Sequence, residues 1–223
     1  MNEKKICFIL CVNDEMYEEE CLRYIGLLHV PQGYEVEQLS VKGAPSMTAG
    51  YQFGMQQSDA KYKVYLHQDV FISNPDFLAE LLQVFTDERV GMFGMVGAPK
   101  LPPNGVMWAE GRVGMIYSSN IRESGLAVIG PVKQPYTEVE AIDGLLMATQ
   151  YDLPWREDLF LGWDFYDVSQ SMEFRRKEYK VVVPYMEHAW CMHDDGYVNL
   201  EKYFEWQEVF LQEYGDMIHA EDY

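Results

Sequence analysis

The chain has 223 residues, of which 48% are hydrophobic and 14% aromatic, values that suit one folded domain and exclude a disordered, collagen-like or low-complexity chain. The 36 acidic residues outnumber the 17 basic ones, and the formal net charge is −19. Nucleic acid and anionic membranes are therefore excluded as partners, because a body this acidic repels them. A phosphorylated ligand would need backbone amides, a few basic side chains or a bound cation; alternatively, the acidity serves only solubility.

The four cysteines form no CxxC pair, and two of them lie inside the apolar run of residues 6–12. This placement predicts buried, reduced thiols in a cytoplasmic protein. The same run is too short for the core of a signal peptide. Neither it nor any other apolar stretch approaches the roughly 20 residues of a membrane span, so we expect no span.

Strands and helices are predicted to alternate over the first hundred residues. Residues 5–12 are continuously apolar, which is typical of a strand buried on both faces of a parallel sheet. Further strands are expected over residues 34–41, 62–66 and 90–98, and helices over residues 17–28, 46–57 and 74–85, the last with Pro75 in its first position. This alternation predicts an α/β domain with a mostly parallel central sheet flanked by helices.

The second half of the chain is less regular. Residues 99–135 are rich in Pro and Gly and predict loops and short strands that cover one end of the sheet. Beyond them, strands are expected over residues 141–149 and 179–184, and helices over residues 168–178 and 200–214. The aromatic residues of the last helix recur at helical spacing, so we expect them to face the core. With no repeat and no linker, residues 1–223 form one predicted domain.

Polar residues follow several of the predicted strands, where ligands bind in parallel α/β sheets. They are Asn13-Asp14, His67-Gln68-Asp69, Asp143-Gly144 and the run from His193 to Gly196. His67 and Asp69 would point to the same side of an extended segment. An imidazole and a carboxylate suit Mn²⁺ or Mg²⁺ held with a diphosphate, or Zn²⁺ if more imidazoles join. The alternative is a histidine that pairs with a carboxylate and binds no metal.

Two more groups carry potential chemistry. His193 lies beside an acidic turn and is expected at a site, whereas His188 is expected to be a packed core histidine. With His67 and Asp69, His193 would also suit a metal-dependent hydrolase. Asp164 and Asp167 lie among aromatic residues at the start of a helix, where acids either cap the helix or, with raised pKa values, act as general bases.

Together these segments resemble the family 2 glycosyltransferases of the GT-A fold, and more narrowly the small glycosyltransferase-like group that includes the streptomycin-biosynthesis StrF proteins. Residues 6–15 match the family's first strand and nucleotide-facing loop, and residues 43–51 match the segment before the third strand. Residues 62–70 lie where the DxD metal motif lies. Asp167, followed by residues 175–181, matches the spacing from the ED aspartate to the next strand.

The resemblance implies an inverting, metal-assisted transfer of sugar from a UDP-, GDP- or dTDP-sugar to an unknown acceptor, as in polysaccharide biosynthesis. Asp69 would bind Mn²⁺ or Mg²⁺, with His193 as a further ligand. Asp167 would be the general base, with Asp164 as its rival. The residues implied in nucleotide-sugar binding are Asn13, Asp14, Glu15, Ser46, Tyr51, His67, Gln68, Asp143 and Gly144.

The chain departs from the family pattern at two motif positions. His67 replaces the first acid of DxD, and Tyr166 replaces the first acid of the ED pair. These departures leave an alternative function open beside the transferase, namely a catalytically weak or inactive module that binds a nucleotide sugar or a protein partner. The sequence leaves open both the acceptor and a homo-oligomeric state.

Overall fold

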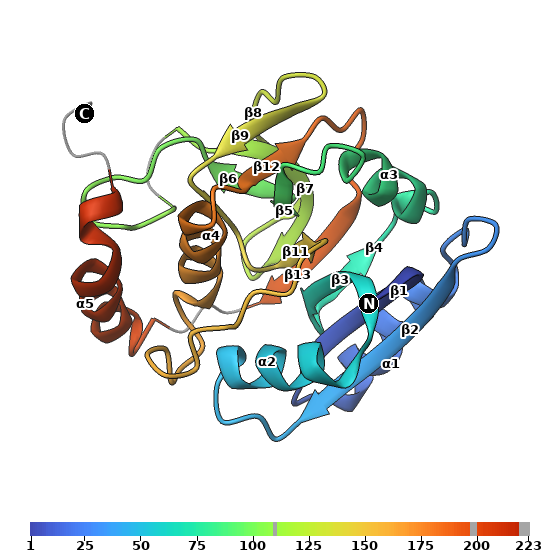
Figure 1. Cartoon of the computed structure of the whole chain (residues 1–223), viewed down its shortest axis with the longest axis horizontal. Coiled ribbons are helices and arrows are strands. Elements are labelled where there is room, and N and C mark those ends of the chain that lie inside the picture. The colour runs from blue at the N-terminus through green and yellow to red at the C-terminus, as the bar shows by residue number, and fades with distance from the viewer. Residues whose placement is uncertain (109–110, 197–199, 219–223) are drawn as a thin grey trace.

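A parallel three-stranded unit forms one half of the main sheet (Figure 1). The structure is a computed structural model that describes residues 1–108, 111–196 and 200–218. The apolar N-terminal run lies in β1 (Asn2–Val12), which pairs in parallel with β2 (Glu35–Lys42) and β3 (Ala60–His67). The first three strands were therefore predicted correctly.

Three helices cover this unit. They are α1 (Glu15–Gly26), α2 (Met47–Gln57) and α3 (Phe77–Val84). Close packing of α2 depends on Gly54, where a Cβ would lie 2.4 Å from Cγ2 of Ile9. The opposite face of β1 carries Phe8, whose ring centroid is 6.3 Å from that of Phe77 in α3. Because neighbouring residues of a strand point to opposite faces, β1 is buried on both, as its continuous apolar run predicted.

The main sheet has the strand order β2-β1-β3-β11-β5-β12-β9. Its other half comprises β11 (Leu146–Thr149), β5 (Val90–Gly94), β12 (Lys180–Pro184) and β9 (Tyr136–Val139). β11 is antiparallel to β3 and β5, and β9 is antiparallel to β12. The predicted α/β class with flanking helices is confirmed, and the sheet is mixed. The chain enters β11 from a turn at the carboxyl end of β3, where His67 N donates to Leu145 O at 3.1 Å, so β11 must run backwards along β3.

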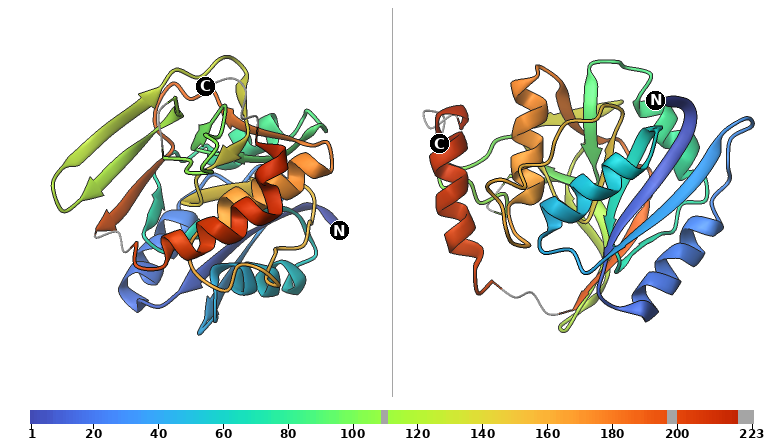
Figure 2. Two further views of the ribbon diagram at one scale, coloured as in Figure 1. Left: turned by 90° about the vertical axis from the view of Figure 1, so that its left-hand side faces the viewer. Right: turned by 60° about the horizontal axis from the view of Figure 1, so that its bottom comes forward.

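A second sheet has the order β10-β6-β7-β13-β4, with β8 paired to β7. Its strands are β4 (Val70–Ile72), β6 (Val96–Ala98), β7 (Val113–Asn120), β8 (Ser124–Gly130), β10 (Ala141–Ile142) and β13 (Cys191–Gly196). In Figure 2 (left) the β7–β8 hairpin projects from the body of the molecule.

This sheet corrects several sequence predictions. The single strand expected over residues 90–98 divides into β5 and β6, which belong to different sheets, and the strand expected over residues 141–149 divides into β10 and β11. The segment 99–135 contains a long hairpin, and β4 and β13 were missed. The divided strands are buried along their whole length, so no change of periodicity marks where the chain passes between sheets.

Helices α4 (Tyr166–Arg176) and α5 (Tyr203–Tyr214) pack together beside the sheets, and the turn η1 (Gly215–Met217) follows α5 (Figure 2). Phe210 and Tyr214 of α5 are buried, as the aromatic spacing predicted, whereas Phe204 is 65% exposed. The four cysteines are free and buried, so the predicted burial of their thiols is confirmed. Among the described residues, no helix is both long and apolar enough to span a membrane.

Candidate active site

The loops that follow β1 and β3 meet at the carboxyl edge of the main sheet. The two strands are parallel neighbours, with Cys11 opposite His67, so both strands end at the same edge of the sheet. The side chain of Gln68 joins the loops, because its Oε1 accepts hydrogen bonds of 3.0 Å from the backbone N of Asn13 and from that of Asp14. Its Nε2 also donates to Oδ1 of Asn13. The polar residues that follow the first and third strands therefore lie together at this edge.

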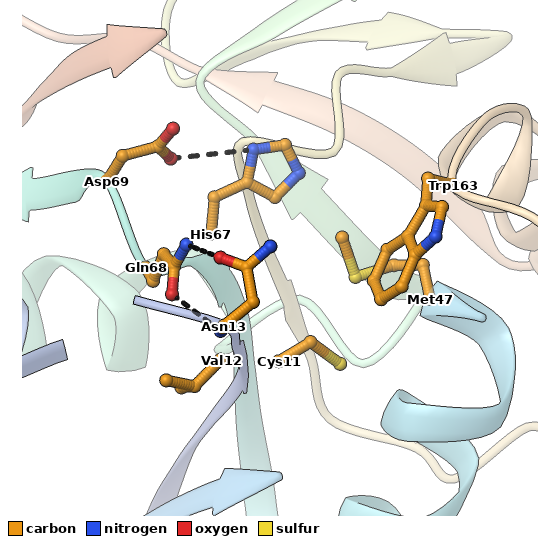
Figure 3. A pocket seen from close by; sticks show the side chains of 8 residues that line it. All are labelled: Cys11, Val12, Asn13, Met47, His67, Gln68, Asp69 and Trp163. Carbon is orange, nitrogen blue, oxygen red and sulfur yellow. Dashed lines mark hydrogen bonds and ion pairs between the residues drawn. The ribbon is translucent and has the colours of Figure 1, made fainter. Parts of the chain in front are cut away.

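A pocket of about 170 Å³ opens at this edge (Figure 3). Four of its lining residues belong to the predicted site: Asn13, His67, Gln68 and Asp69. The other four lining residues were not predicted from the sequence: Cys11, Val12, Met47 and Trp163. Each of them carried a usable signal, since Cys11 and Val12 end the first predicted strand, Met47 adjoins Ser46 and Trp163 adjoins Asp164. Ligand pockets usually exceed about 300 Å³, so this one encloses only part of a larger ligand.

Three potential metal ligands lie beside the pocket. Ligand atoms of His67, Asp69 and His193 all fall within 4.8 Å of one another. Oδ1 of Asp69 is 3.5 Å from Nε2 of His193 and 3.8 Å from Nδ1 of His67. His193 reaches this position because β13 pairs with β4, and Asp194 N donates to Asp69 O at 3.0 Å. His67 and Asp69 come together across a turn after β3, not along an extended segment.

The chemistry of this triad fits a divalent cation. Oδ1 of Asp69 is buried and has no hydrogen-bond partner among the described residues. Burial and the nearby His193 lower the pKa of His67 to about 4, so its imidazole is neutral and able to bind a metal at neutral pH. Burial raises the pKa of Asp69, but the two histidines outweigh that effect and hold it below its ordinary value. Two imidazoles and an ionised carboxylate are a common ligand set for divalent transition metals.

His193 and His188 have different environments. Burial lowers the pKa of His193, but the carboxylates of Asp69, Asp143 and Asp195 outweigh it and raise the pKa above its ordinary value. Because a metal binds the neutral imidazole, cation binding at the triad would compete with protonation of His193. His188 is exposed, so the prediction that it packs in the core was wrong.

A pair of carboxyl groups lies at the start of α4. Oδ2 of Asp167 accepts a 2.9 Å hydrogen bond from Gly144 N, and its Oδ1 accepts one of 2.8 Å from Val168 N. Asp143 accepts from Leu145 N at 2.8 Å. Burial and the charge of Asp143 raise the pKa of Asp167 to about 7, and burial also raises the pKa of Asp143. A carboxyl group that titrates near neutral pH suits a general base.

Asp164 lies just before the same helix. It is half-buried, and burial raises its pKa. Asp164 and Asp167 both lie near Tyr203 of α5, since burial and their two charges raise the pKa of that tyrosine to about 12. Between the two acids, Phe165 adopts a left-handed backbone with φ of 59°, a conformation rare for a bulky residue. Its ring packs 4.8 Å from that of Tyr203, so α5 supports this turn.

The remaining predicted donor-binding residues lie outside the pocket lining. Asp14 caps α1 by accepting from Met16 N and Tyr17 N, and Ser46 caps α2 by accepting from Ala49 N. Tyr51 is fully buried. Glu15 is exposed, 3.9 Å from Nζ of Lys42. Capping and burial are structural roles, and donor binding by these four residues stays a prediction.

Comparison with known proteins assigns the chain to a family. A model described as "Glycosyltransferase like family" matches residues 7–214, so the chain belongs to that glycosyltransferase-like family. No curated protein sequence matches the chain.

Solved structures show the same fold. S. aureus TarS 1-349 in complex with UDP has a TM-score of 0.53 and 11% identity over 94% of this chain and 65% of its own. The mannosyltransferase PcManGT from Pyrobaculum calidifontis, with GDP-Man and Mn²⁺, has a TM-score of 0.57 and 13% identity over 95% and 62%. GalNAc-T7 with UDP, GalNAc and Mn²⁺ has a TM-score of 0.60 and 11% identity over 96% and 49%. The chain therefore spans less than two thirds of each of these structures, and the likeness confirms the expected GT-A fold.

Proposed function

We propose that the protein is an inverting, metal-assisted glycosyltransferase that uses a nucleotide-diphosphate sugar. The observation that carries the proposal is the proximity of the His67, Asp69 and His193 triad to a carboxyl pair with raised pKa values. The two groups are neighbours, because the turn of residues 143–145 contacts both: His67 N donates to Leu145 O at 3.1 Å, and Gly144 N donates to Oδ2 of Asp167 at 2.9 Å. Family membership and the GT-A fold support the same function.

The triad would hold Mn²⁺ or Mg²⁺. When bound, such a cation neutralises charge that develops on the leaving diphosphate. The cation would also offset the repulsion between the diphosphate and a chain of net charge −19. The pocket beside the triad, with Asn13 and Gln68 in its wall, would receive part of the donor. The similar structures hold UDP or GDP-Man, two of them with Mn²⁺, and this supports a nucleotide-sugar donor for this chain.

Asp167 would act as the general base. Its carboxylate accepts the proton of the acceptor hydroxyl, whose oxygen forms a bond to the anomeric carbon of the donor. The bond from that carbon to the diphosphate breaks, the nucleoside diphosphate leaves, and attack from the opposite side inverts the anomeric configuration. Hydrogen bonds from Gly144 N and Val168 N orient the carboxylate. Asp164 is the rival base, because its pKa is also raised by burial.

A thermal-shift screen tests donor binding. The native protein is heated with UDP, GDP, dTDP and CMP, and with their sugars, each with and without Mn²⁺, because a ligand that binds only the folded state raises the melting temperature. We expect a shift with one diphosphate nucleotide that depends on Mn²⁺, and its loss in Asp69→Ala. Asp76→Ala is the matched control, since Asp76 is an exposed acid that pairs with His29. Absence of a shift with every nucleotide would refute the proposal.

Turnover separates the enzyme from the alternative, a module that only binds a nucleotide sugar or a partner. We expect donor consumption by the native protein. Asp167→Asn should abolish transfer while it preserves the Mn²⁺-dependent thermal shift. If Asp164→Asn loses transfer and Asp167→Asn does not, Asp164 is the general base. If the native protein binds the donor but shows no turnover, the module is favoured.

A further inference from the structure

Tyr166 makes a contact that the proposed mechanism does not use. Its hydroxyl forms a hydrogen bond with Nε2 of His67. Tyr166 is the first residue of α4 and is 5% exposed, and its ring centroid lies 6.0 Å from that of His67 and 5.9 Å from that of Tyr51. The bond therefore joins the helix that carries Asp167 to the strand end that carries a potential metal ligand.

Gly144 makes room for this contact. A Cβ at Gly144 would lie 2.0 Å from the Tyr166 hydroxyl, so no other residue fits there without displacing that group. The backbone N of the same glycine donates to Asp167 at 2.9 Å. One turn thus sets the positions of both the tyrosine hydroxyl and the neighbouring carboxylate. The next residue of the turn, Leu145, accepts a 3.1 Å hydrogen bond from the backbone N of His67.

The two ring nitrogens of His67 face different partners. Nε2 meets the Tyr166 hydroxyl, whereas Nδ1 lies 3.8 Å from Oδ1 of Asp69 and faces the triad (Figure 3). A neutral imidazole carries its single proton on one nitrogen, and only the other has a lone pair for a metal. Histidines that bind metals generally donate their second N–H to an outer partner, and loss of that partner weakens metal binding about 10- to 100-fold.

We propose that Tyr166 is a positioning residue for the cation site: its hydroxyl accepts the Nε2–H of His67 and leaves the Nδ1 lone pair directed at the cation. The inference rests on the proposed function. It also connects the two departures from the family motifs, because His67 and Tyr166 are those two replacements and they contact each other. In this pair the imidazole of His67 needs an outer hydrogen-bond partner, and the hydroxyl of Tyr166 supplies it.

The first experiment measures Mn²⁺ affinity of the full chain from the loss of the free Mn²⁺ signal in electron paramagnetic resonance. We expect Tyr166→Phe to weaken binding about 10- to 100-fold. Tyr214→Phe is the matched control, because Tyr214 is a fully buried tyrosine whose hydroxyl bonds to Glu173 at 2.7 Å, in the contact between α4 and α5. Its loss should lower stability but leave Mn²⁺ affinity unchanged. A native affinity in Tyr166→Phe would overturn the inference.

A double-mutant cycle separates positioning from general damage. An aspartate at position 67 has no tautomer to fix, so Tyr166→Phe should cost little Mn²⁺ affinity in a His67→Asp background. Equal losses in both backgrounds would overturn the inference. Activity supplies another readout, since saturating Mn²⁺ should restore turnover in Tyr166→Phe but not in Asp167→Asn.

A spectroscopic test needs neither a metal nor a variant that folds well at position 166. Long-range ¹H–¹⁵N NMR of the native protein reports the tautomer of each histidine, and the His67→Asp spectrum identifies the signals of His67. We expect the Nε2–H tautomer, and the Nδ1–H tautomer would overturn the inference. Failure of the native protein to bind Mn²⁺ would instead refute the cation site of the proposed function, and the positioning role with it.

Discussion

Replacement of Asp167 by asparagine should change how the stability of the protein depends on pH. Burial and Asp143 raise the pKa of Asp167 from its ordinary 3.8 to about 7. Between these values the folded protein binds a proton that the unfolded chain has released. Its free energy of unfolding must therefore fall as pH rises through this window, and the loss is complete above the folded pKa.

The size of the effect follows from the shift. Each pH unit is worth about 1.36 kcal/mol, so ionisation of Asp167 costs the folded state about 4 kcal/mol in all, of which roughly 3 kcal/mol falls between pH 5 and 8. Asparagine removes this cost. Its amide oxygen can accept from only one of the two N–H donors, Gly144 and Val168, which costs about 1–3 kcal/mol at every pH. Asp167→Asn should be less stable than the native protein at pH 5 and close to it, or more stable, at pH 8.

Urea unfolding followed by tryptophan fluorescence at pH 5, 6, 7 and 8 measures this difference. The free energy of unfolding of Asp167→Asn relative to the native protein should rise by roughly 3 kcal/mol across the series. Stability curves that run parallel in the two proteins would refute the reasoning, since they would show that Asp167 titrates alike in the folded and unfolded states. With the same pKa, the transfer rate of the native enzyme should increase as pH rises through about 7, because the base must be ionised to accept a proton.

Three further predictions concern the rest of the molecule. Gly144→Ala should lower stability by about 1–3 kcal/mol and weaken Mn²⁺ binding, because the new methyl group collides with the Tyr166 hydroxyl; an unchanged melting temperature would contradict this. Arg156→Ala removes a 3.0 Å ion pair to Glu213 and should cost about 1–2 kcal/mol, with faster amide hydrogen exchange in α5 as the local sign. Cys21 is fully buried, and burial raises its pKa to about 12, so this thiol should react with Ellman's reagent at pH 8 only after unfolding; rapid labelling of Cys21 in the native protein, located by peptide mapping, would disprove its protection.

Local patterns predicted most of the elements. The apolar run of residues 5–12 is a short-range feature, and it led to the correct strand, β1. The polar residues that follow β1 and β3 are another, and several of them line the pocket. Two of the residues predicted to bind the donor, Asp14 and Ser46, also cap α1 and α2 through side-chain hydrogen bonds. A cap and a ligand use the same residue types beside a helix N-terminus, so sequence pattern alone does not separate them.

Tertiary structure decided how the site is completed. His193 reaches Asp69 only because β13 pairs with β4, two strands that the sequence analysis missed. Tyr166 meets His67 across 99 residues of chain, and its significance follows from that contact. Hydrophobic periodicity reports which face of an element is buried, so the sequence by itself determined most of the elements. The polar residues after the first and third strands indicated the edge of the sheet at which polar groups gather. Strand pairing depends on the packing of distant segments, and so does the choice of the side chain that packs against a glycine. Only the tertiary structure shows them.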